Sequence, residues 1–119
     1  MRRQTITRVL LAVLLTSAML SAAEAPGQVQ TRELTGIVLA KSNDAPLANA
    51  IVYLKNTKTR DMRTYITAGD GRYRFPALQM NADYEVYAER DGHRSETKTL
   101  SFFDSRRQAS ITLHINLSQ

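Results

Sequence analysis

The stretch that decides the fold is Thr67-Ala-Gly-Asp-Gly-Arg-Tyr-Arg-Phe75. Its turn formers Gly69, Asp70 and Gly71 lie between two short runs that are rich in β-forming residues. Glycine adopts without steric cost the positive φ angles that tight hairpin turns need, and aspartate tolerates them. The stretch therefore predicts a β-hairpin whose structural turn is formed by these three residues.

The residues after this turn alternate between polar and apolar side chains, which is the period of a half-buried strand. Tyr73 and Phe75 are expected to face the core, and the arginine before each of them to face solvent. Because proline cannot donate a ladder hydrogen bond, we expect the strand to end at Pro76. A calcium or phosphate loop is disfavoured, because Asp70 is the one carboxylate in the loop and no helix follows it.

The same alternation recurs along the chain, with turn-forming stretches at close to regular intervals and no helical pattern after residue 32. This pattern predicts an all-β fold, a seven-stranded antiparallel two-sheet β-sandwich. The expected strands are residues 33–40, 50–55, 62–67, 72–75, 84–89, 96–102 and 109–117. The expected core consists of Val38, Val52, Leu54, Tyr73, Phe75, Leu78, Tyr84, Val86, Ile111, Leu113 and Ile115.

The first residues have the organisation of a secretory signal peptide. Arg2, Arg3 and Arg8 give a positive start, the apolar run Val9–Leu15 follows, and Ser21-Ala22-Ala23 fits the small-x-small cleavage rule. We expect cleavage after about Ala23. A retained membrane anchor is the alternative, but the apolar run is short for a membrane-spanning helix.

Cleavage at that point divides the chain into a signal peptide (1–23), a flexible leader (24–32) and the sandwich (33–119). The mature chain would then be periplasmic or extracellular, with no membrane span. It has no cysteine, so an exported sandwich must be held together by packing alone. The formal net charge of +5 includes the three signal-peptide arginines, so the balance after cleavage does not argue for a nucleic-acid partner.

A series of short motifs, in this order and spacing, resembles the carboxypeptidase regulatory-like domain. The motifs are Gly36-x-Val38, Ala45-Pro46-Leu47, Ala50-x-Val52-x-Leu54, Asp70-Gly71-x-Tyr73-x-Phe75, Leu78 and Tyr84-x-Val86-x-Ala88. The resemblance implies a transthyretin-like (prealbumin-like) sandwich, grouped with carbohydrate-binding-like folds, in a secreted bacterial stand-alone form without catalytic residues. One departure is Ala68, where such domains often have an aspartate.

The residues that could support catalysis are few. His93 lies in a loop, and His114 alternates with apolar residues, so both are expected to face solvent. A metal site needs three or four converging ligands. An iron site like that of intradiol dioxygenases would use two tyrosines and two histidines, and the chain looks too small to build its pocket. We therefore expect no enzyme activity, no metal and no cofactor.

Two groups of surface residues are candidates for binding a partner. The first is a set of apolar and aromatic side chains on the outward phase of their strands: Ile37, Leu39, Ile51, Tyr53, Tyr65 and Tyr87. The second is a basic rim formed by loops: Arg90, His93, Arg94, Arg106 and Arg107.

These features predict an exported, non-catalytic module that binds or scaffolds at the cell envelope. It would act through an exposed sheet face or edge strand on an unknown protein partner, with homo-oligomerisation as one form of this. The alternative is a carbohydrate-binding module that stacks a polysaccharide on Tyr53, Tyr65 and Tyr87, because sugar rings need an aromatic platform with polar flanks.

Overall fold

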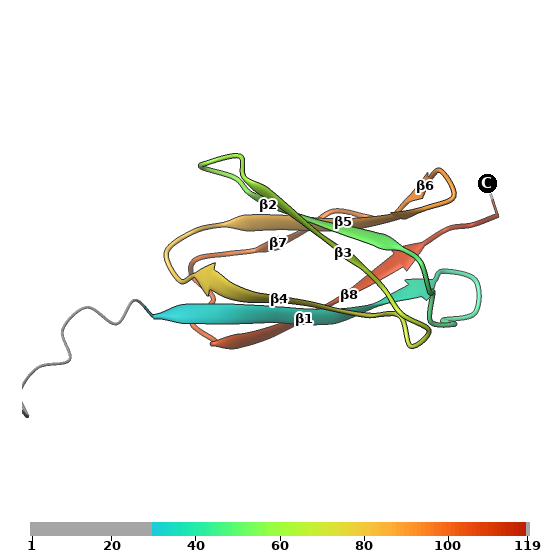
Figure 1. Ribbon diagram of the computed structural model, residues 1–119, viewed down its shortest axis with the longest axis horizontal. Coiled ribbons are helices and arrows are strands. Elements are labelled where there is room, and N and C mark those ends of the chain that lie inside the picture. The colour runs from blue at the N-terminus through green and yellow to red at the C-terminus, as the bar shows by residue number, and fades with distance from the viewer. Residues whose placement is uncertain (1–29, 119) are drawn as a thin grey trace, which may run out of the picture.

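The computed structural model describes residues 30–118, so the predicted signal peptide and most of the leader lie outside the described residues. The described part consists of strands and turns arranged in two sheets (Figure 1). It contains no helix with the length and apolar character needed to cross a membrane. The strands are β1 (Thr31–Ala40), β2 (Ile51–Asn56), β3 (Met62–Ile66), β4 (Arg72–Gln79), β5 (Tyr84–Arg90), β6 (His93–Arg94), β7 (Lys98–Leu100) and β8 (Gln108–Ile115).

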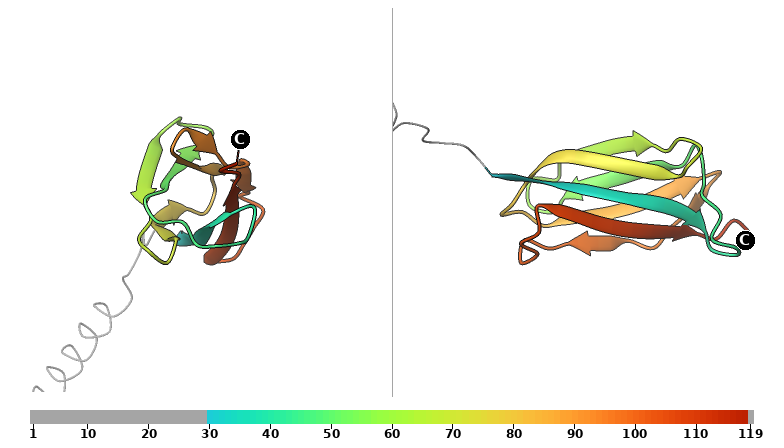
Figure 2. Two further views of the ribbon diagram at one scale, coloured as in Figure 1. Left: turned by 90° about the vertical axis from the view of Figure 1, so that its right-hand side faces the viewer. Right: turned by 90° about the horizontal axis from the view of Figure 1, so that it is seen from below.

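Sheet A has the strand order β4-β1-β8, and sheet B has the order β3-β2-β5-β6, with β7 also paired to β5. Seen from one end, the two sheets face each other as the two layers of the sandwich (Figure 2). The predicted all-β, two-sheet sandwich is therefore confirmed. Every predicted core residue is buried except Ile111, which is partly buried and packs against the core.

The pairing of β1 with β8 is parallel, whereas the sequence predicted antiparallel strands throughout. Short turns favour antiparallel pairing only between strands that follow one another in the chain. β1 and β8 are the first and last strands, and β8 joins the free edge of β1 after the chain has passed through sheet B. Turn signals in the sequence therefore did not determine the direction of this pair.

The turn at Gly69–Gly71 is present, but the hairpin predicted around it is not, because β3 and β4 belong to different sheets. The N–H of Gly71 donates to the carbonyl of Ala68 (2.9 Å), and its own carbonyl accepts from the N–H of Val38 in β1 (2.8 Å). Gly71 has a φ of 71°, and a Cβ there would lie 2.7 Å from the Val38 carbonyl oxygen. The turn therefore carries the chain from sheet B onto β1 of sheet A.

The second Asp-Gly pair forms the two-residue hairpin. Asp91 and Gly92 both have positive φ, 52° and 80°, and Arg90 pairs with His93 on either side of them. Two positive φ angles are the mark of a type I′ turn, which matches the twist of antiparallel strands. This hairpin links β5 to β6.

The strand predicted at 96–102 is shortened to β7, and an additional strand, β6, precedes it; both pair with β5. The interruption is at Ser95, whose hydroxyl oxygen accepts a hydrogen bond from the buried N–H of Ala88 (2.8 Å). The N–H of Ser95 donates to the Ala88 carbonyl (2.8 Å). The side chain thus takes the place of a backbone partner and divides the strand.

Several strand limits differ from the sequence prediction, and those of β1 and β4 affect the packing. β1 begins at Thr31, so the last two residues assigned to the leader belong to a strand, and Arg32 is buried. β4 continues past Pro76 to Gln79, with an irregular register against β1. Proline is tolerated there because β4 is an edge strand, where an N–H is not needed on the free side.

Candidate functional site

The outer face of sheet B carries a stack of three side chains from adjacent strands. Tyr53 of β2 and Tyr87 of β5 are register partners, with ring centroids 4.9 Å apart and planes inclined by 19°. The guanidinium carbon of Arg94, in β6, lies 3.8 Å from the centre of the Tyr87 ring. Because β5 lies between β2 and β6, Tyr53 and Arg94 reach Tyr87 from opposite sides. An ion pair with Glu89 (3.2 Å) helps to hold Arg94 in this position.

The edge strand β3 extends this face with apolar side chains. Ile66 is the register partner of Ile51 and is 64% exposed, and Met62 is 49% exposed. An edge strand has a neighbour on one side only, so its outward side chains are less covered than those of β2. We call the set Ile51, Tyr53, Met62, Ile66, Tyr87 and Arg94 the sheet B face.

The predicted binding surface is only partly assembled. Ile51, Tyr53 and Tyr87 lie together on the sheet B face. Ile37 and Leu39 lie on β1, whose outer face belongs to sheet A on the opposite side of the sandwich. The two groups therefore cannot form one patch.

Tyr65 lies on the inner phase of β3, because its register partner is the core residue Val52. Its ring meets the ring of Phe75 edge-on at 6.2 Å. Arg63, two residues earlier on the same phase, donates to the carbonyls of Pro76 (2.7 Å) and Ala77 (3.3 Å) in β4. These two β3 residues thus cover the open side of the sandwich between β3 and β4.

Met62 and Ile66 were not among the predicted binding residues, and Arg94 was predicted to belong to the basic rim. The alternation of Met62, Thr64 and Ile66 along the strand was the signal that could have placed Met62 and Ile66 on one face. Nothing in the sequence indicated that Arg94 would lie over Tyr87.

The basic rim is not formed as one surface. Arg90, His93 and Arg94 lie at the β5–β6 hairpin, whereas Arg106 and Arg107 lie in the β7–β8 loop at the other end of the sandwich (Figure 1). The Arg106 guanidinium is 2.6 Å from the Asp104 carboxylate and lowers the pKa of that carboxyl from its ordinary value to about 2. Because the two groups of basic residues lie at opposite ends of the sandwich, they form two separate surfaces.

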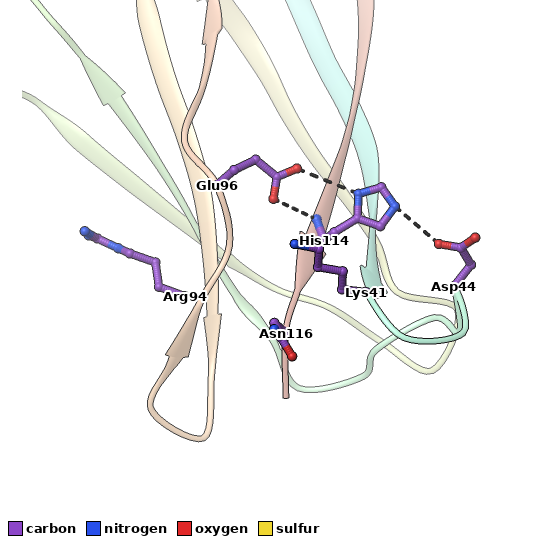
Figure 3. Close-up of a pocket in the computed structure, with 6 residues that line it drawn as sticks. All are labelled: Lys41, Asp44, Arg94, Glu96, His114 and Asn116. Carbon is purple, nitrogen blue, oxygen red and sulfur yellow. Dashed lines mark hydrogen bonds and ion pairs between the residues drawn. The ribbon is translucent and has the colours of Figure 1, made fainter. Parts of the chain in front are cut away.

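A groove with a volume of about 490 Å³ contains His114 between two carboxylates (Figure 3). The Nε2 of His114 is 3.3 Å from an Asp44 oxygen, and its Nδ1 is 3.7 Å from a Glu96 oxygen. The other Glu96 oxygen accepts a hydrogen bond from the backbone N–H of His114 (3.2 Å). The groove is also lined by Lys41, Asn116 and Arg94, whose side chain points away from the histidine.

This cluster joins the β1–β2 loop, the segment between β6 and β7, and the end of β8. Its lining residues include no serine, threonine, tyrosine or cysteine that His114 could activate as a nucleophile. His93 does not line the groove. Among the described residues, no group of three histidine, cysteine, aspartate or glutamate side chains could hold a metal ion. The arrangement brings together side chains of three segments that are far apart in the chain.

Comparison with known proteins gives one family and several structures of similar fold. The family model of the carboxypeptidase regulatory-like domain matches residues 33–117. The crystal structure of BcpA, the major pilin subunit of Bacillus cereus, is 13% identical with a TM-score of 0.58, over 75% of this chain and 31% of that chain. The group B streptococcus pilus 2b backbone protein is 17% identical with a TM-score of 0.52, over 80% of this chain and 46% of that one.

A catechol 1,2-dioxygenase from Acinetobacter is also similar, at 15% identity and a TM-score of 0.56, over 77% of this chain and 54% of that chain. This chain thus spans about a third to a half of the length of these three proteins. At such low identity these likenesses concern the fold alone. A search of curated proteins gives no match.

Proposed function

Because the chain belongs to the carboxypeptidase regulatory-like domain family, we propose that it is a non-catalytic binding module of the cell envelope. It is exported with cleavage after about Ala23, and the sheet B face contacts a protein partner. The similarity in fold to pilin subunits supports a scaffolding role of this kind. The family is described as a regulatory-like domain, which supports the non-catalytic part of the proposal.

The observation that carries the proposal is the exposure of Ile66 and Met62 on the free edge strand, beside the stacked Tyr53 and Tyr87. Exposed apolar side chains that gather on one face of a sheet are candidates for an interaction site. Tyrosine and arginine are also the residues that are enriched where partners bind tightly. The free edge of β3 has unpaired backbone groups, to which a strand of a partner can add.

The geometry favours a protein over a polysaccharide. A sugar ring stacks on the open face of an aromatic ring, but Tyr87 has Tyr53 on one side and Arg94 on the other. The strand neighbours of this stack include the charged residues Lys55 and Glu85. Tyr65, which that alternative also used, lies on the inner phase of β3.

The test compares envelope complexes extracted without denaturation from cells that make the wild-type chain, Ile66→Lys or Ser110→Lys. Ser110 is exposed on β8 of sheet A, so Ser110→Lys is the matched control for an added positive charge. We expect the wild type and Ser110→Lys to migrate in an assembly larger than the chain alone, and Ile66→Lys to be released from it. Migration of Ile66→Lys with the assembly would contradict the proposed surface.

The export part is tested by the intact mass of the same extracted chain. We expect a mature protein that begins at or near Glu24. A full-length chain that begins at Met1 and remains in the cytoplasm would contradict export.

A further inference from the structure

The β7–β8 loop presents two adjacent phenylalanines to solvent. Phe103 is 82% exposed and Phe102 is 47% exposed, and their ring centroids are 4.0 Å apart. They lie at the opposite end of the sandwich from the β5–β6 hairpin and outside the sheet B face (Figure 1). We call Phe102 and Phe103 the phenylalanine tip.

The tip is held in place by hydrogen bonds to the loop backbone. The N–H of Phe102 donates to a carboxylate oxygen of Asp83 (2.6 Å). The guanidinium of Arg32, which is only 2% exposed, donates to the carbonyls of Ser101 and Asp104, each at 2.9 Å. A buried arginine thus fixes both sides of the loop, so the fold itself places the two rings in solvent.

Exposed cations lie near the tip, and the carboxylates of Asp83 and Asp104 are engaged within the fold. Arg106 and Arg107 lie three and four residues after Phe103, and both are exposed. Asp83 accepts the Phe102 N–H, and Asp104 pairs with Arg106. The outward charge next to the two rings therefore includes the guanidinium of Arg107.

The neighbouring β2–β3 turn adds two more cations at this end. Its Thr57 donates to the carbonyl of Asp83 (3.0 Å), the residue that also holds the tip. Lys58 and Arg60 of this turn are exposed. The tip thus lies beside positive side chains from two loops.

The same end of the sandwich receives the preceding chain. β1 begins there, so residues before Thr31 join the fold beside the β7–β8 loop (Figure 2). The phenylalanine tip therefore lies at the end of the sandwich where the described chain begins.

We propose that the phenylalanine tip inserts among the lipids of an anionic membrane surface, with Lys58 and Arg107 against the headgroup phosphates. Two projecting rings without polar atoms, next to cations, match an apolar layer that lies under a negative one. A rigid tip also loses little conformational freedom on insertion. This inference adds a second surface to the proposed envelope module and does not depend on the partner of the sheet B face.

The first test places a reporter in the tip. The chain contains no tryptophan, so Phe103→Trp in the full chain introduces a single tryptophan whose emission can be followed selectively. We expect its emission to shift to shorter wavelength with vesicles of phosphatidylglycerol and phosphatidylcholine, and to be quenched when the acyl chains are brominated. Ile66→Trp, at an exposed site on the sheet B face, is the control that should show neither effect.

The emission and its quenching report how deeply position 103 enters the bilayer. They therefore test insertion of the tip even if the upstream segment binds vesicles by itself. An unshifted, unquenched Phe103→Trp emission on vesicle-bound protein would overturn the lipid proposal and make a protein partner the next candidate for the tip. Quenching of Ile66→Trp to the same degree would also overturn it, because the insertion would then not be specific to this end.

The second test uses vesicle sedimentation with Phe102→Ser/Phe103→Ser and, separately, Lys58→Gln/Arg107→Gln. We expect each pair to weaken binding by roughly tenfold or more, from the apolar area lost in one case and the charge lost in the other. The loss from the Lys58 and Arg107 variant should shrink at high salt, because salt screens exposed charges. Unchanged binding of both folded variants would contradict the proposal, as would equal binding to vesicles of phosphatidylcholine alone.

Discussion

Gly36 is the residue on which the packing of sheet A depends most directly. The Tyr73 ring lies over it, and the Tyr73 hydroxyl donates to the carbonyl of Ile111 in β8 (2.6 Å). Burial raises the pKa of this hydroxyl, so it remains a neutral donor. One tyrosine thus connects β4 to β8 across the central strand β1, and it can do so because β1 has no side chain at that position.

Replacement of Gly36 by alanine is therefore expected to destabilise the sandwich strongly. The added Cβ would lie 1.9 Å from the Ile111 carbonyl oxygen and 2.4 Å from the Tyr73 ring. Overpacking of this kind costs about 3 kcal/mol or more when backbone atoms must move. Urea unfolding of Gly36→Ala against the wild type measures the loss.

Gly69→Ala is the matched control for this prediction. A Cβ at Gly69 has no atom of another residue within 4 Å, and Gly69 does not have a positive φ. Its free energy of unfolding should stay within about 0.5 kcal/mol of the wild type. Equal stability of the two alanine variants would show that the tyrosine does not pack over Gly36 as described.

Among the elements, the two Asp-Gly pairs show what local sequence can and cannot determine. Both are turns, because the chemistry of these residues suits a tight turn. Asp91-Gly92 joins paired strands, whereas Asp70-Gly71 joins strands of different sheets. The difference comes from β1, whose Val38 binds the carbonyl of Gly71, and such a contact with a distant strand is not encoded near the turn.

Ser95 gives a prediction for the division between β6 and β7. Ser95→Ala removes the oxygen that accepts the Ala88 N–H, a buried donor in the centre of sheet B. A buried donor without a partner costs about 1–3 kcal/mol. We expect a loss of that size in urea unfolding, together with faster hydrogen exchange of the Ala88 amide.

The control for Ser95 is Ser110→Ala, at an exposed serine of β8. It should leave both stability and the exchange rate of Ala88 close to wild type. Slow exchange of Ala88 in Ser95→Ala would mean that another group accepts its hydrogen bond.

At the scale of the whole molecule, Arg32 connects the first strand to two distant loops. Its guanidinium donates to the carbonyls of Ala82 (2.6 Å), Ser101 and Asp104 (both 2.9 Å). These residues follow β4 and β7 in the chain. The start of β1, which the sequence placed in a leader, is thus a central connection of one end of the sandwich.

Arg32→Met is expected to lower the free energy of unfolding by about 2–4 kcal/mol, because buried carbonyls lose their donors. Arg74→Met is the control, since Arg74 makes an exposed ion pair with Glu33 and should change stability much less. Urea unfolding of both variants makes the comparison. Equal losses would contradict the special role of the buried arginine.

The sequence was sufficient to predict the sandwich and nearly all of its core, because period-two alternation depends only on local burial. The arrangement of the surfaces was harder to predict. Tyr53 and Tyr87 share a face through the register of β2 and β5, whereas Ile37 has the same outward phase on the opposite sheet. The strand order decides which outward residues meet, and strand order depends on contacts between residues far apart in the chain.

Photo-crosslinking in living cells, from single positions on the two outer faces, tests whether sheet B carries the binding surface. A photoreactive side chain at Ile66 samples the sheet B face, and one at Ser110 samples sheet A. We expect a defined crosslinked product from position 66 and none from position 110. Crosslinks from position 110 alone, or equal crosslinks from both, would contradict the assignment of sheet B as the binding surface.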